Sequence, residues 1–110
     1  MATHIDKETL KQKLDAGEHF HLVEVLAPGE YERLHIKGAE NIPFGKVIEK
    51  AKQRFSKDDE IVVYCADEEC KASPKAAEKL ETFGFTNVKE YPGGKKEWSE
   101  AGYPVEGREA

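Results

Sequence analysis

The fold is decided by the stretch Ile61-Val62-Val63-Tyr64-Cys65, which continues as Ala66-Asp67-Glu68-Glu69-Cys70-Lys71-Ala72-Ser73-Pro74. The apolar, largely β-branched run is typical of a strand buried on both faces of a parallel sheet. The polar residues after it form a loop, and a helix then starts with Ser73 as its N-cap and Pro74 at its first position. Cys65 therefore stands at the carboxyl end of a strand, where loop N–H groups and a helix N-terminus favour its thiolate. This order predicts a cysteine nucleophile in a loop that binds anions.

Helical and extended patterns alternate on both sides of this stretch. Helices are predicted at residues 6–16, 28–34, 46–55, 73–83 and 95–101. Strands are predicted at residues 20–25, 39–43, 61–64 and 86–91. The first helix has Asp6 as its N-cap and ends at Gly17. This alternation favours an α/β fold with a parallel sheet and helices on both faces. Ligands of such folds bind at the carboxyl ends of the strands, where Cys65 lies.

Composition narrows the classes of function. The 110 residues predict a single domain over 1–110, and we expect residues 106–110 to be a frayed tail. The net charge of −5 argues against nucleic-acid binding, which needs a basic surface. We expect neither a membrane span nor a signal peptide, because the apolar runs are short and residues 1–6 lack a basic flank. Two cysteines are too few for a disulfide scaffold, so we expect a reducing, cytoplasmic setting, and a monomer.

Several segments, taken together, resemble the rhodanese-like domain family over nearly the whole chain. Residues 22–25, Leu-Val-Glu-Val, are similar to the family's first core strand, L-V-D-V-R. Residues 35–43 resemble its G-H-I-P-G-A-x-N-I-P segment, and residues 61–65 resemble the strand that delivers the active-site cysteine. The closing G-[FY]-x-x-V, G-G, W and A-G-x-P-V motifs are matched by residues 84–88, 93–94, Trp98 and 101–105.

This resemblance implies a three-layer α/β/α domain with a central, mainly parallel five-stranded sheet. It also implies a thiosulfate sulfurtransferase-type activity, in which Cys65 takes a sulfane sulfur as a persulfide and passes it to a thiol or to cyanide. The partners would be a small sulfur donor and a thiol or protein acceptor, and no metal or organic cofactor is expected. The persulfide would be bound by the loop residues Ala66, Asp67, Glu68, Glu69, Cys70, Lys71, Ala72 and Ser73.

The chain departs from the family pattern at four positions in its first half. Leu26 stands where the family often has arginine, which removes one cation that could hold thiosulfate. Glu24 replaces aspartate, Leu34 replaces glycine and Lys37 replaces proline.

The loop itself resembles a subgroup with the spacing C-x4-C-x2-S. Read as far as Lys71, it gives C-x5-K, close to the C-x5-R loop of rhodanese-fold phosphatases and arsenate reductases. Lysine lacks the bidentate fork of arginine. The acidic residues 67–69 would also repel phosphate, arsenate and thiosulfate alike. An oxyanion enzyme is therefore the less favoured interpretation.

Cys70 has three competing interpretations. It is an inert loop residue, a resolving thiol that forms a disulfide with Cys65 or accepts its outer sulfur, or a metal ligand together with Cys65. A zinc site is disfavoured because the four histidines show no paired ligand spacing near the loop. The sequence does not decide whether the two thiols have the geometry of a disulfide.

The remaining candidates each have a functional and a structural interpretation. In the functional interpretation Lys71 stabilises the thiolate or binds substrate. In the structural interpretation it is a solvated lysine in the first turn of a helix. Ser73 is interpreted as an N-cap rather than a catalytic hydroxyl, and His35 as a structural residue rather than a base. Residues 67–69 either form a solvated loop or select a cationic or protein acceptor. Cys65 as a mere buried apolar residue is disfavoured by its position.

Two alternatives to an enzyme stay open. The absent arginine and the acidic loop favour a non-catalytic binding or regulatory module on the same fold, whereas the intact Cys65 argues against it. Cys65 and Cys70 would alternatively form a thiol redox switch.

Overall fold

The computed structural model describes residues 2–110, and Met1 of the predicted domain lies outside the described residues. Its central sheet has five parallel strands in the order β1-β6-β5-β2-β4. They are β1 (Thr3–His4), β2 (His21–Glu24), β4 (Glu40–Asn41), β5 (Glu60–Tyr64) and β6 (Asn87–Tyr91). A separate antiparallel pair joins β3 (His35–Ile36) to β7 (Val105–Glu106). The predicted α/β architecture around a five-stranded, mainly parallel sheet is confirmed.

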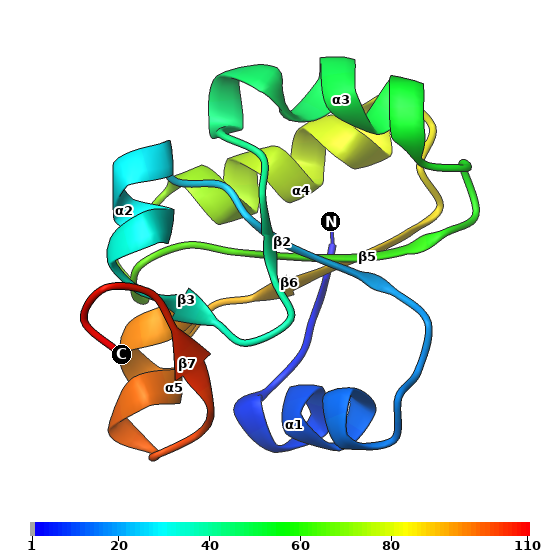
Figure 1. The fold of residues 1–110 in the computed structure, drawn as a ribbon. Helices are drawn as coiled ribbons and strands as arrows, with labels where there is room; N and C mark the ends of the chain where they lie inside the picture. Colours follow the sequence, from blue (N-terminus) through cyan, green and yellow to red (C-terminus); the bar gives the residue numbers. More distant parts are fainter. Residues whose placement is uncertain (1) are drawn as a thin grey trace.

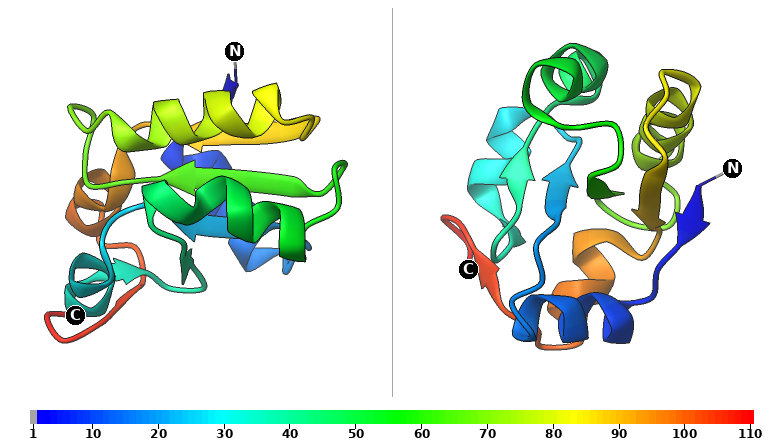
Figure 2. Two further views of the ribbon diagram at one scale, coloured as in Figure 1. Left: turned by 90° about the horizontal axis from the view of Figure 1, so that it is seen from above. Right: turned by 90° about the vertical axis from the view of Figure 1, so that its right-hand side faces the viewer.

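Helices cover both faces of this sheet (Figure 1). On one face lie α3 (Val47–Arg54), which follows the 3-10 turn η1 (Phe44–Lys46), and α4 (Ala72–Thr82). On the other face lie α1 (Lys7–Asp15) and α5 (Gly94–Glu100), whereas α2 (Pro28–Arg33) sits near the carboxyl end of β2. The end-on view in Figure 2 shows the sheet between these two helix layers.

The sheet divides the apolar core into two clusters. Along β5, Ile61 and Val63 pack towards α3 and α4, and Cys65 continues on that side. Val62 and Tyr64 belong to the cluster on the α1 and α5 side. Because neighbouring residues of a strand point to opposite faces, Tyr64 and Cys65 serve different halves of the molecule.

The cap predicted for the first helix is confirmed, and the cap predicted for the helix after Cys65 is wrong. The Asp6 carboxylate accepts the Thr9 N–H at 2.8 Å, and Gly17 follows the helix with a φ of +68°. By contrast, the N-cap of α4 is Lys71, which makes no side-chain capping bond. Ser73 lies inside the first turn with its side chain buried, because its hydroxyl has partners on another strand.

Three short strands and the end of the chain depart from the sequence prediction. β1, β3 and β7 have two residues each, which is too short for a strand pattern. Residues 106–110 are not a frayed tail: the Arg108 and Glu109 N–H groups donate to the carbonyls of Glu32 and Arg33 at 3.0 and 2.9 Å. These bonds satisfy carbonyl groups at the end of α2 that have no partner within the helix.

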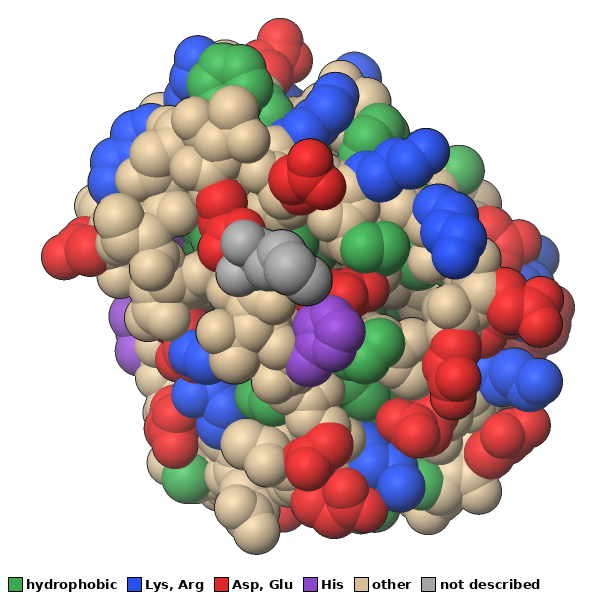
Figure 3. All heavy atoms as spheres, turned by 180° about the vertical axis from the view of Figure 1, so that it is seen from behind, with side chains coloured by type: hydrophobic (Ala, Val, Ile, Leu, Met, Phe, Trp, Pro, Cys, Tyr) green, Lys and Arg blue, Asp and Glu red, His purple; other side chains and the backbone are tan. Residues whose placement is uncertain are grey.

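The surface is of mixed charge. On the face opposite to that of Figure 1, acidic and basic side chains are interspersed with small apolar areas (Figure 3). Phe83, at 45% exposure, is the one large exposed apolar side chain among residues 2–110. Within the same residues, no helix has both the length and the apolar character needed to cross a membrane.

Candidate active site

Cys65 follows directly on β5 and is almost completely buried, with 1% of its surface exposed. Its backbone is held from the side of α5. The N–H of Lys95 donates to the Cys65 carbonyl at 3.0 Å, and the N–H of Lys96 donates to the Ala66 carbonyl at 2.9 Å. Gly94 makes this approach possible, because a Cβ there would lie 2.5 Å from the Cys65 carbonyl oxygen and its φ is +67°. The start of the loop is therefore fixed to the sheet and to α5.

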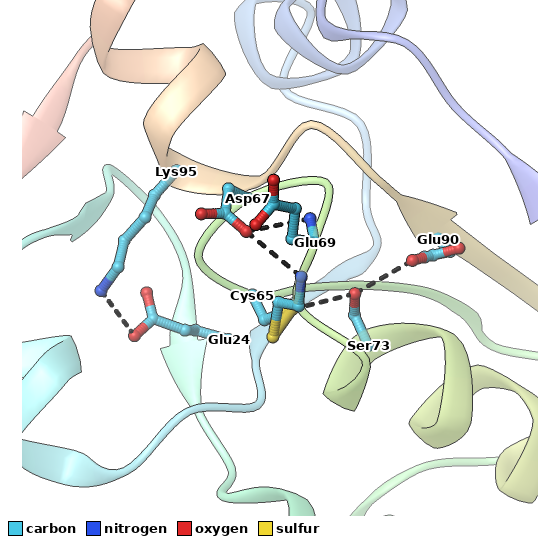
Figure 4. Close-up of a disulfide and its surroundings, with 8 residues drawn as sticks. Glu24, Cys65, Asp67, Glu69, Ser73, Glu90 and Lys95 are labelled. Atoms are coloured by element: carbon cyan, nitrogen blue, oxygen red, sulfur yellow. Dashed lines mark hydrogen bonds and ion pairs between the residues drawn. A yellow bond between two sulfur atoms is a disulfide. The ribbon is translucent and has the colours of Figure 1, made fainter.

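The thiol of Cys65 is bonded to that of Cys70 in a disulfide, with 6.4 Å between the two Cα atoms (Figure 4). Of the three interpretations of Cys70, the structure favours the one in which the two sulfurs meet. In this state Cys65 has no thiol proton and is not a nucleophile. Reduction must therefore precede any chemistry at Cys65.

The loop donors are only partly available to a bound anion. The Asp67 carboxylate accepts the N–H groups of Glu69 at 3.0 Å and of Cys70 at 3.2 Å (Figure 4). This is an Asx turn, in which a short acidic side chain bonds to the backbone two and three residues on. In the disulfide state the N–H groups of Glu69 and Cys70 therefore do not face a bound anion, and the anion-binding loop of the reduced protein stays a prediction.

The other acidic residues and Lys71 lie at the surface. Glu68, Glu69 and Lys71 are exposed, and Lys71 makes no ion pair within the described part of the chain. The loop borders a shallow hollow lined by Asp67, Glu68, Glu69, Gly93, Lys96, Glu97 and Glu100. The mouth of the candidate site is therefore acidic, as residues 67–69 predict.

The role of Ser73 differs most from the prediction, because its side chain lies beside the Cys65 sulfur and does not cap α4. Its Oγ lies 3.3 Å from the Cys65 Sγ and donates a hydrogen bond to Glu90 Oε2 at 3.0 Å. Glu90 in turn lies 3.1 Å from His4 Nε2. Sequence reasoning missed both Glu90 and His4. The available signal was the alternation in β6, which places Glu90 on the same buried face as Val88.

A second buried polar cluster lies on the opposite side of the sheet. Glu24 accepts from Tyr64 Oη at 2.9 Å and from Lys95 Nζ at 3.1 Å. Lys95 also donates to the carbonyls of Glu30 and Leu34 at 2.9 and 2.7 Å. Burial raises the pKa of Glu24, while the Lys95 ammonium opposes that rise. Burial also raises the pKa of Tyr64 above its usual range, so Tyr64 stays a neutral donor.

His35 has contacts that fit the predicted structural role. Its Nδ1 lies 2.7 Å from the Tyr31 carbonyl, its ring stacks on that of Tyr31, and its Nε2 lies 3.6 Å from Glu106. These contacts join α2 to β7.

Comparisons with known proteins agree with this fold. The family model of the rhodanese-like domain matches residues 6–101. The chain is 36% identical over 83 residues to the thiosulfate sulfurtransferase PspE of Escherichia coli, and the aligned region covers 74% of this chain and 75% of PspE. It is 34% identical over 95 residues to YrkF of Bacillus subtilis, and the aligned region covers 86% of this chain and 50% of YrkF. The crystal structure of BH2092 from Bacillus halodurans matches with a TM-score of 0.90 and 33% identity, over 98% of this chain and 79% of that one.

The fold and site define a three-layer α/β domain that presents a cysteine at the carboxyl end of a central strand. The chain belongs to the rhodanese-like domain family, as predicted, and sulfurtransferases are among its relatives. The C-x4-C-x2-S subgroup stays a prediction. The chain spans half the length of YrkF, so the activities of whole relatives enter only as proposals.

Proposed function

We propose that this protein is a sulfurtransferase that carries a sulfane sulfur as a persulfide on Cys65. The observation that carries the proposal is the position of Cys65. It directly follows β5, beneath a polar loop and the start of α4, in a chain 36% identical to a thiosulfate sulfurtransferase. Such a position favours a thiolate and stabilises a terminal persulfide anion.

The first half-reaction loads the sulfur. After reduction of the disulfide, the Cys65 thiolate attacks the outer sulfur of thiosulfate. The S–S bond of thiosulfate breaks, sulfite leaves with the electron pair, and the persulfide anion stays on Cys65. In the second half-reaction an acceptor thiolate attacks the outer sulfur. This step forms a persulfide on the acceptor and returns Cys65 as a thiolate.

Cys70 is proposed as the resolving thiol. Its sulfur attacks the inner sulfur of the Cys65 persulfide, expels hydrosulfide, and forms the Cys65–Cys70 disulfide. An external dithiol then reduces this disulfide and restores both thiols. This step unloads the protein when no acceptor is present.

The acidic hollow beside the loop supports a protein acceptor rather than a small anionic one. Its carboxylates repel small anions and attract cationic side chains around an acceptor thiol. Thiosulfate, a small dianion, is expected to load Cys65 slowly, and a protein donor would load it faster.

The test is the intact mass of the reduced, desalted protein after incubation with thiosulfate. We expect a gain of one sulfur atom in the parent protein and in Cys70→Ser, and none in Cys65→Ser. The gain should persist longer in Cys70→Ser than in the parent, because no resolving thiol expels it. Absence of a gain in Cys70→Ser would reject thiosulfate transfer and favour a binding module.

A further inference from the structure

A chain of hydrogen-bonding groups runs from the Cys65 sulfur to the surface. Ser73 Oγ lies 3.3 Å from Cys65 Sγ, Glu90 Oε2 accepts from Ser73 at 3.0 Å, and Glu90 Oε1 lies 3.1 Å from His4 Nε2. In Figure 4, Ser73 stands between the disulfide and Glu90. The four residues come from the loop after β5 and from α4, β6 and β1, so only the folded chain brings them together.

Burial along this chain falls off in one direction. Cys65 and Ser73 are each 1% exposed, and the side chain of Glu90 is 8% exposed. The side chain of His4 is 66% exposed. The chain therefore connects a buried sulfur atom to solvent.

Glu90 is a buried carboxylate without a lysine or arginine partner in the described part of the chain. Its charge is stabilised by the hydroxyl of Ser73 and the ring N–H of His4. The other groups around it are Glu78 on α4, which lines the same surface depression, and the apolar Val63, its neighbour on β5.

The hydroxyl of Ser73 gives the chain a direction. A serine has one hydroxyl proton, which is donated to Glu90, so the lone pairs of Oγ face the sulfur. In the disulfide the sulfur carries no proton. Once the disulfide is reduced, the Cys65 S–H is the group that can donate to Ser73.

We propose that Ser73 and Glu90 remove the thiol proton of Cys65. The proton of Cys65 moves to Ser73 Oγ while the hydroxyl proton of Ser73 moves to Glu90 Oε2. The products are a thiolate and a neutral carboxylic acid, so the buried site holds one negative charge before and after the step. That charge moves from Glu90 to the sulfur, where the loop and the N-terminus of α4 stabilise it.

His4 completes the path. Its exposed ring lies 3.1 Å from Glu90 Oε1 and orients the carboxylate whose other oxygen, Oε2, takes the proton from Ser73. Ser73 contacts the reacting atom and acts as a catalytic residue, whereas Glu90 and His4 act through it. The inference rests on the proposed function only in that Cys65 must act as a nucleophile.

The test is the rate at which iodoacetamide alkylates Cys65, followed by intact mass across neutral to alkaline pH. All proteins carry Cys70→Ser and are reduced, so that Cys65 is the only thiol. Near neutral pH we expect Ser73→Ala and Glu90→Gln to react at least about tenfold more slowly, because positioned bases accelerate proton removal by roughly 10²–10⁴-fold. At strongly alkaline pH all rates should converge, because hydroxide then removes the proton. Glu78→Gln is the matched control, and its rate should not change.

Three results would overturn the inference. The first is an unchanged or faster rate in Glu90→Gln near neutral pH, because the carboxylate then only repels the thiolate. The second is an equal loss at every pH, which indicates a structural role. The third is an unchanged rate in a folded Ser73→Ala. This substitution removes only a hydroxyl group, so it can still test the inference if Glu90→Gln does not fold. If the alkylation pattern holds but thiosulfate adds no sulfur to the parent, the proposed function fails and the proton path stands.

Discussion

Two carboxylates are buried on opposite faces of one sheet, and their surroundings differ. Glu24 on β2 faces the α5 side, where Tyr64 and Lys95 bond to its two oxygens. Glu90 on β6 faces the α4 side, where Ser73 and the exposed His4 take the same places. Figure 4 shows Glu24 with Lys95, and Glu90 with Ser73, on either side of Cys65.

The difference separates a structural from a functional carboxylate. Glu24 is neutralised by a lysine that also holds two carbonyls around α2, so the cluster fixes α2 and α5 to the sheet. Within residues 2–110, Glu90 has no lysine or arginine beside it, and it contacts a hydroxyl that touches the sulfur. A closed, charge-paired cluster contributes to folding, whereas an open chain that ends in solvent is suited to moving a proton.

The largest expected effect tests the structural half of this comparison. Lys95→Met leaves Glu24 buried without its cation, and the free energy of unfolding should fall by about 3–5 kcal/mol. Urea denaturation of the variant and of the control Lys96→Met, which alters an exposed neighbour, measures the difference. Equal losses in the two variants would show that Glu24 does not depend on this pairing.

The next effect concerns the disulfide on the other half. Under oxidising conditions, Cys70→Ser should lower the free energy of unfolding by about 2 kcal/mol, because the short loop is no longer closed in the unfolded chain. In dithiothreitol the parent and the variant should differ by about 0.5 kcal/mol or less. A difference that persists in dithiothreitol would assign the loss to packing at Cys70 instead.

A smaller effect is expected at Glu90. Glu90→Gln keeps an acceptor oxygen for Ser73, so the free energy of unfolding should change by about 1 kcal/mol. The measurement is urea denaturation beside Lys95→Met. If the two losses were equally large, Glu90 would be as structural as Glu24 and the comparison would fail.

The smallest effect is expected at His4. Because this side chain is largely exposed, His4→Ala should alter stability by about 0.5 kcal/mol or less. Near neutral pH, the alkylation rate of Cys65 should fall less in His4→Ala than in Glu90→Gln, since water can replace an exposed ring. A larger fall than in Glu90→Gln would place the proton acceptor on His4.

The sequence predicts what depends on neighbours along the chain. The apolar run of β5, the cap at Asp6 and the glycine after α1 are local signals, and the structure agrees with each. The position of Cys65 follows from the same run. Of the strands with two residues, β4 lies within the predicted strand at residues 39–43, whereas β1, β3 and β7 carry too little pattern to be recognised.

The predictions that fail depend on contacts between distant segments. Ser73 has the residue type and position of an N-cap, but a carboxylate from β6 binds its hydroxyl. Asp67 has the appearance of a solvated loop residue, yet in the disulfide state it binds the backbone that was predicted to hold an anion. The hydrogen-bonded series from Cys65 to His4 joins the loop after β5 to α4, β6 and β1, and no spacing along the sequence predicts it.

The hydrogen bonds from α5 to the start of the loop affect which residues of this site can be replaced. The N–H groups of Lys95 and Lys96 hold only the carbonyls of Cys65 and Ala66, whereas residues 67–70 bond to one another and to the Cys65 sulfur. The backbone at Cys65 and Ala66 is thus held by α5, whereas the segment between Ala66 and Ser73 is held mainly by its own contacts. Its length and its chemistry can be replaced while the cysteine and the serine behind it keep their places, so one scaffold can accommodate different reactions.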